Sequence, residues 1–380
     1  MKTEIATKSK KVNIESYQES WEKLTLEKIA ELAKDAYLPN NNEEIPYIGL
    51  EHINQQTLSL NSIGKSSDVT SNKFRFEDGD ILFGKLRPYF RKVYRPNFSG
   101  ICSTDIWVVR AKPKIDQGWL FYLLAGEDFI KLASGGSSGT RMPRADWQHL
   151  KDTIWSVPEL LEQKKIAEVL LSLDDKIRIN KKIIDNFDDI AGNLFKQQFI
   201  DVEDGLTDKW QTRELGDFFP IKTGKKDANV ATQNGEYPFF SCSQDILATD
   251  EFSFDSSSIL LAGNGDFNVK WYEGKFEAYQ RTYVLTPYKK ELLGFLYYLT
   301  KHFLNDITAG HRGSVIRFIT KGMIENFKIK IPNNTELEQK AKIFNEIIQA
   351  IDSYKNENHK LSKIRDSLLP KLMSGKIRVN

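Results

Sequence analysis

The chain has 380 residues, of which 40% are hydrophobic, 12% aromatic and 28% charged. This length and apolar content predict two or three globular domains and exclude disorder over most of the chain. Its 54 lysines and arginines nearly balance 52 aspartates and glutamates, which excludes a polycation that binds nucleic acid indiscriminately. An anion-binding face must therefore come from local clustering of charge.

The cysteine content and hydropathy indicate a soluble intracellular protein. Cys102 and Cys242 are isolated thiols, which cannot form a zinc knuckle or a disulfide framework and favour a reducing compartment. No apolar run approaches the roughly 20 residues that a membrane span needs. Residues 1–20 lack the hydrophobic core of a signal peptide. We therefore expect a cytoplasmic protein that makes no membrane contact.

The order of sequence features repeats. Each half opens on a tryptophan and continues through an apolar helical stretch, a glycine- and cation-rich segment and a short strand that ends in proline. A Glu-Gln pair and a long helical pattern then follow. The matching positions are Trp21 and Trp210, 119–132 and 292–307, 134–144 and 309–317, Pro158 and Pro332, and Glu162-Gln163 and Glu338-Gln339.

Both long helical patterns carry apolar residues at alternating steps of four and three, which is typical of a coiled coil. The predicted seam residues are Ile166, Leu170, Leu173, Ile177, Asn180, Ile184 and Phe187 in the first helix, and Ile343, Ile347, Tyr354, Glu357, Leu361, Ile364 and Leu368 in the second. These residues, together with Gln163 and Gln339, are assigned to the interface between the helices and with partner subunits.

Asn180 and Glu357 are the polar residues at the matching step of each seam, where a polar side chain can fix register. Each helix is expected to run for about 40 residues, or about 60 Å. Thr335-Glu-Leu-Glu338 fits a capping box at the start of the second helix. A stripe of this length cannot be buried alone, so we expect the two helices to pack together.

Short strands are predicted between the helices, separated by glycine, asparagine and serine. They lie at 46–50, 74–76, 80–86 and 106–110, and at 238–241, 258–262, 269–273 and 282–285. Each globular part is therefore predicted to be α+β. The expected organisation is an N-terminal extension at 1–20, a domain at 21–158, a helical spacer at 159–200, a domain at 201–332 and a helical spacer at 333–380.

The usual catalytic motifs are absent from the sequence. Gly64-Lys65-Ser66 has the end of a P-loop, but Ser59 stands where its first glycine must be. The five histidines lack metal-ligand spacing, and there is no Gly-x-Ser-x-Gly elbow. The Asn/Asp-Pro-Pro-aromatic motif of amino-methylating enzymes is missing as well. We predict no catalytic residue and no metal site in this chain.

Basic residues cluster with aromatic residues instead. Lysine and arginine can neutralise phosphates, and an arginine fork can read guanine O6 and N7. The predicted DNA contacts are Lys85, Arg87, Tyr89, Arg91 and Lys92, then Arg141 and Arg144 in the first glycine-rich segment, His311, Arg312 and Arg317 in the second, and Lys225, Lys226, Gln280 and Arg281. The alternative interpretation is a solvated strand pair with outward charges and ordinary structural turns.

Five segments together resemble the specificity subunits of type I DNA restriction-modification enzymes. These segments are Pro158 to Ile177, Leu194 to Phe199, Ile364 to Val379, Gly79 to Pro88 and Gly235 to Phe240. The likeness covers nearly the whole chain from Trp21. The second helix departs from the pattern, because Glu338-Gln-Lys-Ala-Lys-Ile343 replaces the fuller Glu-Gln-Lys-Lys-Ile-Ala form.

The resemblance implies an α+β fold with two target recognition domains in tandem, separated by two long antiparallel helices that form a coiled coil with a pseudo-twofold. Each domain would read one half of a bipartite site in double-stranded DNA. The implied partners are two modification subunits, which methylate adenine at N6, and restriction subunits, which cleave DNA. S-adenosylmethionine, ATP and Mg would bind to those partners, none to this non-catalytic chain, in a bacterial or archaeal cytoplasm.

Two other classes of function remain open at this point. One is a self-contained methyltransferase or nuclease with a degenerate site. The other is a purely structural coiled-coil scaffold whose globular parts bind protein. The salt dependence of DNA affinity separates a scaffold from a DNA-binding protein, because neutralisation of phosphates makes affinity fall steeply with salt.

Overall fold

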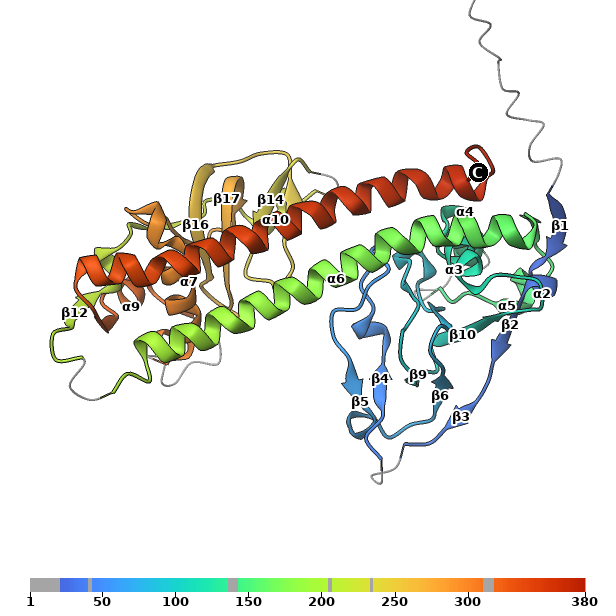
Figure 1. The fold of residues 1–380 in the computed structure, drawn as a ribbon, viewed down its shortest axis with the longest axis horizontal. Helices are drawn as coiled ribbons and strands as arrows, with labels where there is room; N and C mark the ends of the chain where they lie inside the picture. The colour runs from blue at the N-terminus through green and yellow to red at the C-terminus, as the bar shows by residue number, and fades with distance from the viewer. Residues whose placement is uncertain are drawn as a thin grey trace, which may run out of the picture. The chain divides into compact units, whose positions relative to one another are not determined.

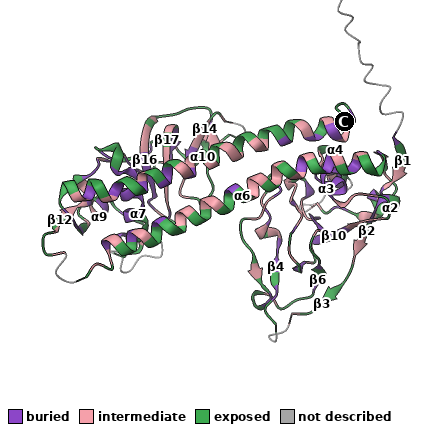
Figure 2. Cartoon of the chain, viewed as in Figure 1, coloured by how far each residue is buried: buried purple, intermediate pink, exposed green. Residues whose placement is uncertain are grey.

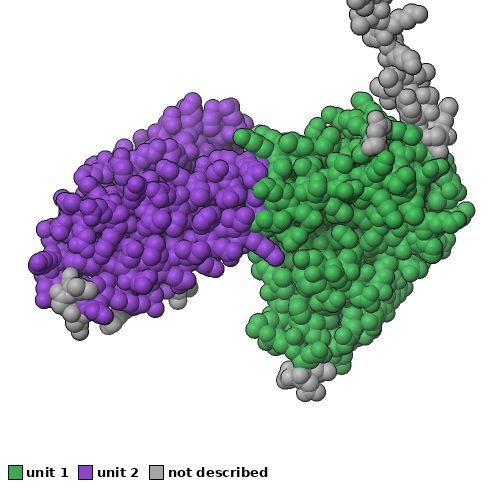
Figure 3. Space-filling model, in the orientation of Figure 1, with its two compact units in different colours: residues 1–179, 358–380 green, residues 180–357 purple. Residues whose placement is uncertain are grey.

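The computed structural model describes residues 21–39, 43–135, 143–203, 207–232, 235–309 and 318–379. The chain forms two compact units, residues 1–179 with 358–380 (unit 1) and residues 180–357 (unit 2), as Figure 3 shows. Each unit contains an α+β domain and part of both long helices, which confirms the predicted fold class. The helices, predicted as separate spacers, are thus divided between the units.

Unit 1 forms two main sheets, of strand order β2-β10-β7-β8 and β3-β6-β9-β4-β5, and a small sheet β1-β11. All four predicted strands of this half are present. Its domain elements (Figure 1) are β1 (Glu22–Thr25), α2 (Leu26–Ile29), β2 (Ala30–Ala33), β3 (Ala36–Tyr37), β4 (Pro46–Ile48), η1 (Leu50–His52), β5 (Gly64–Lys65), η2 (Ser66–Asp68), β6 (Lys73–Phe76), β7 (Ile81–Gly84), η3 (Pro88–Phe90), β8 (Val93–Tyr94), β9 (Gly100–Ser103), β10 (Ile106–Ala111), α3 (Gln117–Ala125), α4 (Glu127–Gly135), α5 (Trp147–Leu150) and β11 (Ile154–Val157).

Unit 2 has one large sheet of order β13-β18-β16-β17-β14-β15 and a small sheet β12-β19. The four strands predicted in this half are present as well. The domain elements are β12 (Gln211–Glu214), η4 (Leu215–Asp217), β13 (Ile221–Thr223), η5 (Ala228–Val230), β14 (Tyr237–Phe240), β15 (Leu247–Thr249), β16 (Phe254–Ala262), β17 (Val269–Ala278), β18 (Thr282–Leu285), η6 (Lys290–Leu292), α7 (Leu293–His302), α8 (Leu304–Thr308), α9 (Lys321–Glu325) and β19 (Lys328–Ile331).

The repeat seen in the sequence extends to the strand order. The order β2-β10-β7-β8 of unit 1 matches β13-β18-β16-β17 of unit 2, and β6-β9-β4-β5 matches β16-β17-β14-β15. Both units contain the same parallel pair, β4 with β9 and β14 with β17. In unit 2 the long strands β16 and β17 belong to both of these strand sets, so that the two sets form one continuous sheet. In unit 1 the corresponding strands are interrupted, for example at Gly79, which has a φ of +83° between β6 and β7.

Each repeat closes on itself through its first and last strands. In unit 1 β1 pairs antiparallel with β11, so that Glu22 lies opposite Val157. In unit 2 β12 pairs antiparallel with β19, so that Gln211 lies opposite Ile331. The strand that follows the opening tryptophan therefore pairs with the strand that ends in proline in both units. Backbone hydrogen bonds make this closure, so the side chains of these strands can differ.

The long helices α6 (Leu160–Phe199) and α10 (Asn334–Met373) have 40 residues each, as the heptad pattern predicts. Within unit 2 they pack antiparallel, because Asn180 contacts Glu357 and, further along α6, the ring of Phe187 lies 6.3 Å from that of Tyr354. The start of α10 differs from the capping box predicted at Thr335. Asn333 Oδ1 accepts a hydrogen bond from Glu336 N and caps the helix two residues earlier.

Most of the predicted seam is buried or half-buried (Figure 2), with Ile166 and Leu170 in the unit 1 core and Ile347 in the unit 2 core. Ile343 and Ile364 are 39% and 48% exposed and Gln339 is exposed too, so these three predicted interface residues are not buried within this chain. The reason is that α10 packs against its domain as well as against α6. Its most buried positions in unit 2 are accordingly Leu337, Ala341 and Phe344.

Candidate nucleic-acid interface

Three segments meet at one end of the β2-β10-β7-β8 sheet. Lys85 N donates to Asp105 O at 2.9 Å, and Ala145 N donates to Lys85 O at 2.8 Å. Leu86 and Arg144 form a β-bridge. The segment after β7, the turn before β10 and the end of the glycine-rich segment are thus joined by their backbones. We call residues 85–87, 105 and 143–145 the unit 1 rim.

Cationic side chains gather at the unit 1 rim. Lys85 and Arg144, both predicted DNA contacts, line a cavity of about 340 Å³ together with Lys34, Trp147 and Gln148. Arg144 Nε lies 3.4 Å from Asp105 Oδ1, and the side chain of Arg144 is 55% exposed. The rim therefore offers positive charge and hydrogen-bond donors beside an aromatic ring, which suits contact with phosphates or base edges.

The same junction recurs in unit 2. Gly263 N donates to Arg281 O at 2.8 Å, and Ile319 N donates to Gly263 O at 3.0 Å. Asn264 and Phe318 form the β-bridge that corresponds to the one in unit 1. A Cβ atom on Gly263 would lie 2.4 Å from Arg281 O, so only glycine permits this close approach. We call residues 263–264, 281 and 318–319 the unit 2 rim.

The remaining predicted contacts of unit 2 lie next to this rim. Gln280 N donates to Lys226 O at 2.9 Å, which brings the two predicted segments together. Lys225, Gln280 and Arg281 are exposed. Lys226 forms an ion pair with Glu251, and the hydrogen bond to that carboxylate raises the pKa of Lys226. Its charge is therefore partly satisfied within the chain.

Arg87 and Tyr89 lie on the segment that leaves the unit 1 rim. Arg87 N donates to Pro143 O at 2.8 Å, and Arg87 has a left-handed φ of +52°. Tyr89 is 45% exposed, and its carbonyl accepts a hydrogen bond from Gln56 Nε2 at 3.0 Å. Both residues stay candidate contacts.

Lys92, by contrast, has a structural role. Its Nζ donates to Leu50 O, and burial lowers the pKa of Lys92. In unit 2 the equivalent positions are Asn268 and Cys242, where the amide of Asn268 donates to the carbonyl of Cys242 at 3.0 Å. The backbone pairing of these positions also corresponds, with hydrogen bonds from Gly84 N to Lys92 O and from Ala262 N to Asn268 O. We do not retain Lys92 among the candidate DNA contacts.

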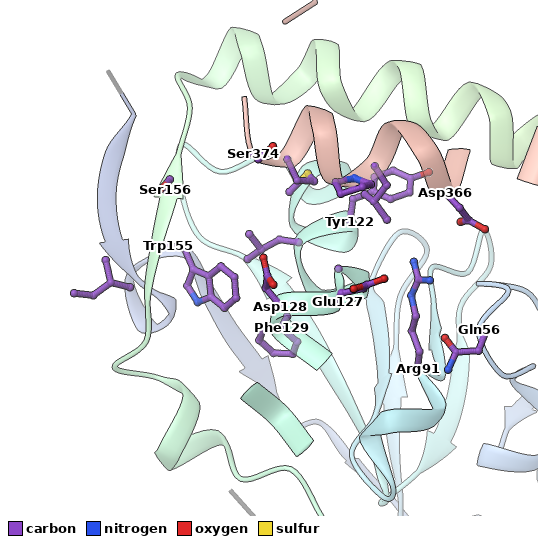
Figure 4. A pocket seen from close by; sticks show the side chains of 16 residues that line it. Gln56, Arg91, Tyr122, Glu127, Asp128, Phe129, Trp155, Ser156, Asp366 and Ser374 are labelled. Carbon is purple, nitrogen blue, oxygen red and sulfur yellow. The ribbon is translucent and has the colours of Figure 1, made fainter. Parts of the chain in front are cut away.

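Arg91 also points into its own domain. Its Nε donates to Ala125 O at 2.6 Å, and burial lowers the pKa of the guanidinium group. Figure 4 shows Arg91 directed into a cavity of about 660 Å³ that Glu127 and Asp366 line as well. This cavity lies beside α4 and the end of α10, with no rim residue in its lining. We therefore do not retain Arg91 either.

Four predicted contacts lie in segments for which no structure is described. They are Arg141 in the first glycine-rich segment and His311, Arg312 and Arg317 in the second. The described residues on both sides of each segment end at α4 or α8 and begin again at the rims. These four residues stay predictions.

Gln163 fastens α6 to the unit 1 domain instead of lying in the helix seam. Its Oε1 accepts a hydrogen bond from Asp116 N at 2.7 Å, and its Nε2 donates to Pro158 O at 2.8 Å. The side chain is 1% exposed. Its placement in the interface between the helices is therefore wrong, since its partners come from the domain.

Unit 1 contains a buried polar network that the sequence did not predict. Tyr122 Oη donates to Asp174 Oδ2 at 2.6 Å, and Arg365 Nη1 donates to Asp174 Oδ1 at 2.6 Å. Burial and the nearby Asp174 raise the pKa of Tyr122. In unit 2 Tyr298 Oη donates to Asp188 Oδ1 at 3.1 Å. With 52 acidic residues in the chain, no sequence signal distinguishes these two aspartates.

Four residues in or beside the rims, Lys34, Asp105, Asn264 and Phe318, were not in the predicted set. The sequence pattern offers one signal common to all four, because each lies within two residues of a strand end or of a glycine-rich segment. Among the residues described here, no cluster of His, Cys, Asp or Glu is placed to hold a metal ion. None of the helices in the described ranges has the length and hydropathy needed to cross a membrane.

The tandem α+β domains, the paired helices and the two rims agree with a family of DNA-reading proteins. The family model for the type I restriction modification DNA specificity domain matches residues 18–186 and 207–363. The chain belongs to this family.

Curated relatives are specificity subunits. The EcoDI specificity subunit of Escherichia coli is 38% identical over 44% of this chain, and the match spans 38% of that protein. The putative MjaX specificity subunit of Methanocaldococcus jannaschii is 25% identical over 97% of this chain and 96% of that protein. The crystal structure of an S subunit from M. genitalium has a TM-score of 0.57 at 19% identity, covering 93% and 96% of the two chains, and thus shares the fold.

Proposed function

We propose that this chain is the DNA-reading specificity subunit of a type I restriction-modification complex, and that each unit reads one half of a bipartite site. The observation that supports this most strongly is that the same backbone junction, the rim, occurs in both units and presents an exposed arginine in each. Both units belong to repeats that match a DNA specificity domain. Two copies of one reading surface in a single chain suit a target with two parts.

Partners would supply the chemistry. Two modification subunits would bind S-adenosylmethionine and flip the target adenine out of the duplex for N6 methylation. Restriction subunits would use ATP and Mg for translocation and cleavage. The long helices α6 and α10 would serve as the docking platform in the cytoplasm, and this chain would contribute sequence recognition without a catalytic group.

The proposal is tested with the full chain, alone and with its modification subunits, on duplex DNA that contains a library of sites. We expect methylated adenines at one bipartite motif with the complex and none with the chain alone. Methylation or cleavage by the chain alone would support the enzyme alternative instead.

A second measurement addresses the scaffold alternative. Neutralisation of several phosphates makes the logarithm of the affinity fall linearly with the logarithm of the salt concentration. We expect this steep dependence for the complex with the specificity subunit, and a much smaller slope for the modification subunits alone. Equal slopes with and without this chain would contradict a DNA-reading role.

A further inference from the structure

Each rim presents an exposed arginine, but from a different segment. In unit 1 the arginine is Arg144, which follows the glycine-rich segment, and the position before β10 is Asp105. In unit 2 the arginine is Arg281, which occupies the position before β18, and Phe318 follows the glycine-rich segment. The two rims therefore place a guanidinium group on opposite sides of the same backbone junction.

The contact with Asp105 orients Arg144. Asp105 Oδ1 accepts from Arg144 Nε at 3.4 Å, which leaves the two Nη groups as donors. These can form the fork that recognises guanine O6 and N7 in a major groove. A carboxylate this close would repel a phosphate, so the pair suits a base edge better than the DNA backbone.

The backbone on both sides of Arg281 is fixed while its side chain is exposed. Arg281 O accepts from Gly263 N at 2.8 Å, and the preceding Gln280 N donates to Lys226 O at 2.9 Å. The next residue, Thr282, is buried. Base recognition needs a side chain that starts from a rigid position, whereas a phosphate contact tolerates a mobile one.

Resting on the proposed function, we propose that Arg144 and Arg281 each read a guanine by a bidentate contact, one in each half of the bipartite target. Asp105 is a positioning residue that acts through Arg144. The inference names a base and a residue for each half-site, whereas the proposed function names only the two units.

The test uses the full chain assembled with its modification subunits. The methylated motif is read by sequencing a randomised duplex library, and affinities for cognate and substituted duplexes are measured at several salt concentrations. Arg281→Ala is expected to lower discrimination by about 10- to 100-fold at one guanine in one half-site. Arg144→Ala should do the same in the other half-site, and Asp105→Asn should weaken preference at the same base as Arg144→Ala.

Two further variants sharpen the result. Arg281→Lys keeps the charge without the fork, so it should keep most of the affinity and lose the guanine preference. Arg213→Ala is the matched control, because Arg213 lies on β12 in the other sheet of unit 2 and pairs with Asp217. It should leave the motif unchanged.

An unchanged motif in both alanine variants would overturn the inference. So would changes in the same half-site, or a uniform loss of affinity on all sequences with a smaller salt slope, which marks a phosphate contact. If the unsubstituted complex showed neither a methylated motif nor preference among duplexes, the proposed function itself would fail.

Discussion

The amide of Asn180 on α6 donates a hydrogen bond of 2.7 Å to the carboxylate of Glu357 on α10. These residues occupy the matching step of the two heptad patterns, where each helix carries its polar seam residue. Asn180 is fully buried. A buried polar pair of this kind fixes the register of two helices, because any sliding would separate the two groups.

We expect Asn180→Leu to lower the free energy of unfolding by about 1.5–3 kcal/mol, because the Glu357 carboxylate loses a buried donor. Urea denaturation measures the change. The double variant Asn180→Leu with Glu357→Leu should recover most of this loss, since apolar packing often replaces a buried polar pair at little cost. Strictly additive effects in the double-mutant cycle would show that the two residues are not coupled.

Removal of Asp174 should destabilise unit 1 more strongly. The side chain of Arg365 is 3% exposed and would lose its 2.6 Å contact with this carboxylate. We expect Asp174→Ala to cost about 3 kcal/mol, which thermal and urea unfolding would show. The adjacent Asp175→Ala removes an exposed ion pair with Arg178 and should cost less than about 1 kcal/mol. Similar losses for the two variants would contradict the structural role of the buried pair.

The two thiols should differ in reactivity. Cys102 is fully buried, and desolvation followed by the charge of Asp80 raises its pKa to about 12, whereas Cys242 is half-buried. At pH 8 a thiol reagent should modify Cys242 in the folded protein and Cys102 only after unfolding. Labelling followed by mass spectrometry identifies the modified residue, and rapid modification of Cys102 in the native state would refute its burial.

Cys102 should also make stability depend on pH. Because its pKa is raised from 9.0 to about 12 in the folded state, the unfolded chain releases this proton first. Its contribution to the free energy of unfolding is complete below pH 9.0 and is lost as pH rises toward about 12. Cys102→Ala should therefore show a smaller loss of stability over that interval, measured by urea denaturation at each pH.

Lys85 and Lys92 are expected to behave differently although they lie in one basic stretch. Lys85→Ala should weaken DNA binding of the complex on all sequences and reduce the salt slope by about 1, as for a phosphate contact. Lys92→Met should lower the free energy of unfolding by about 1–3 kcal/mol, because Leu50 O loses its donor. Its DNA affinity should be unchanged. A loss of stability in Lys85→Ala together with a loss of DNA affinity in Lys92→Met would contradict the roles that we assign to the two lysines.

Periodicity made the long helices predictable. The steps of four and three in α6 and α10 reflect a single geometric rule, and they identified Asn180 and Glu357 as partners in position. Ile343 and Ile364 fit the same rule but are exposed in this chain, because α10 packs against its domain as well as against α6. A one-dimensional pattern does not say which surface takes a given residue.

The candidate site was predictable at the level of segments and less so for single residues. The basic stretch 84–95 contributes Lys85 and Arg87 to the rim, yet Arg91 and Lys92 turn inward to carbonyl groups of Ala125 and Leu50. Composition cannot separate these outcomes, since they depend on the path of the backbone after Arg87. Asp105 lies next to a strand end, which the sequence indicated, but its contact with Arg144, 39 residues later, could not be predicted from the sequence.

The matching hydrogen bonds of Lys92 and Asn268 show how the two copies have been free to diverge. An ammonium group in one copy and an amide in the other fasten the equivalent carbonyl. The hydrogen bond is present in both units although a different residue makes it in each. Two copies that arose by duplication could in the same way carry different residues at their DNA-facing surfaces while the backbone framework stayed the same.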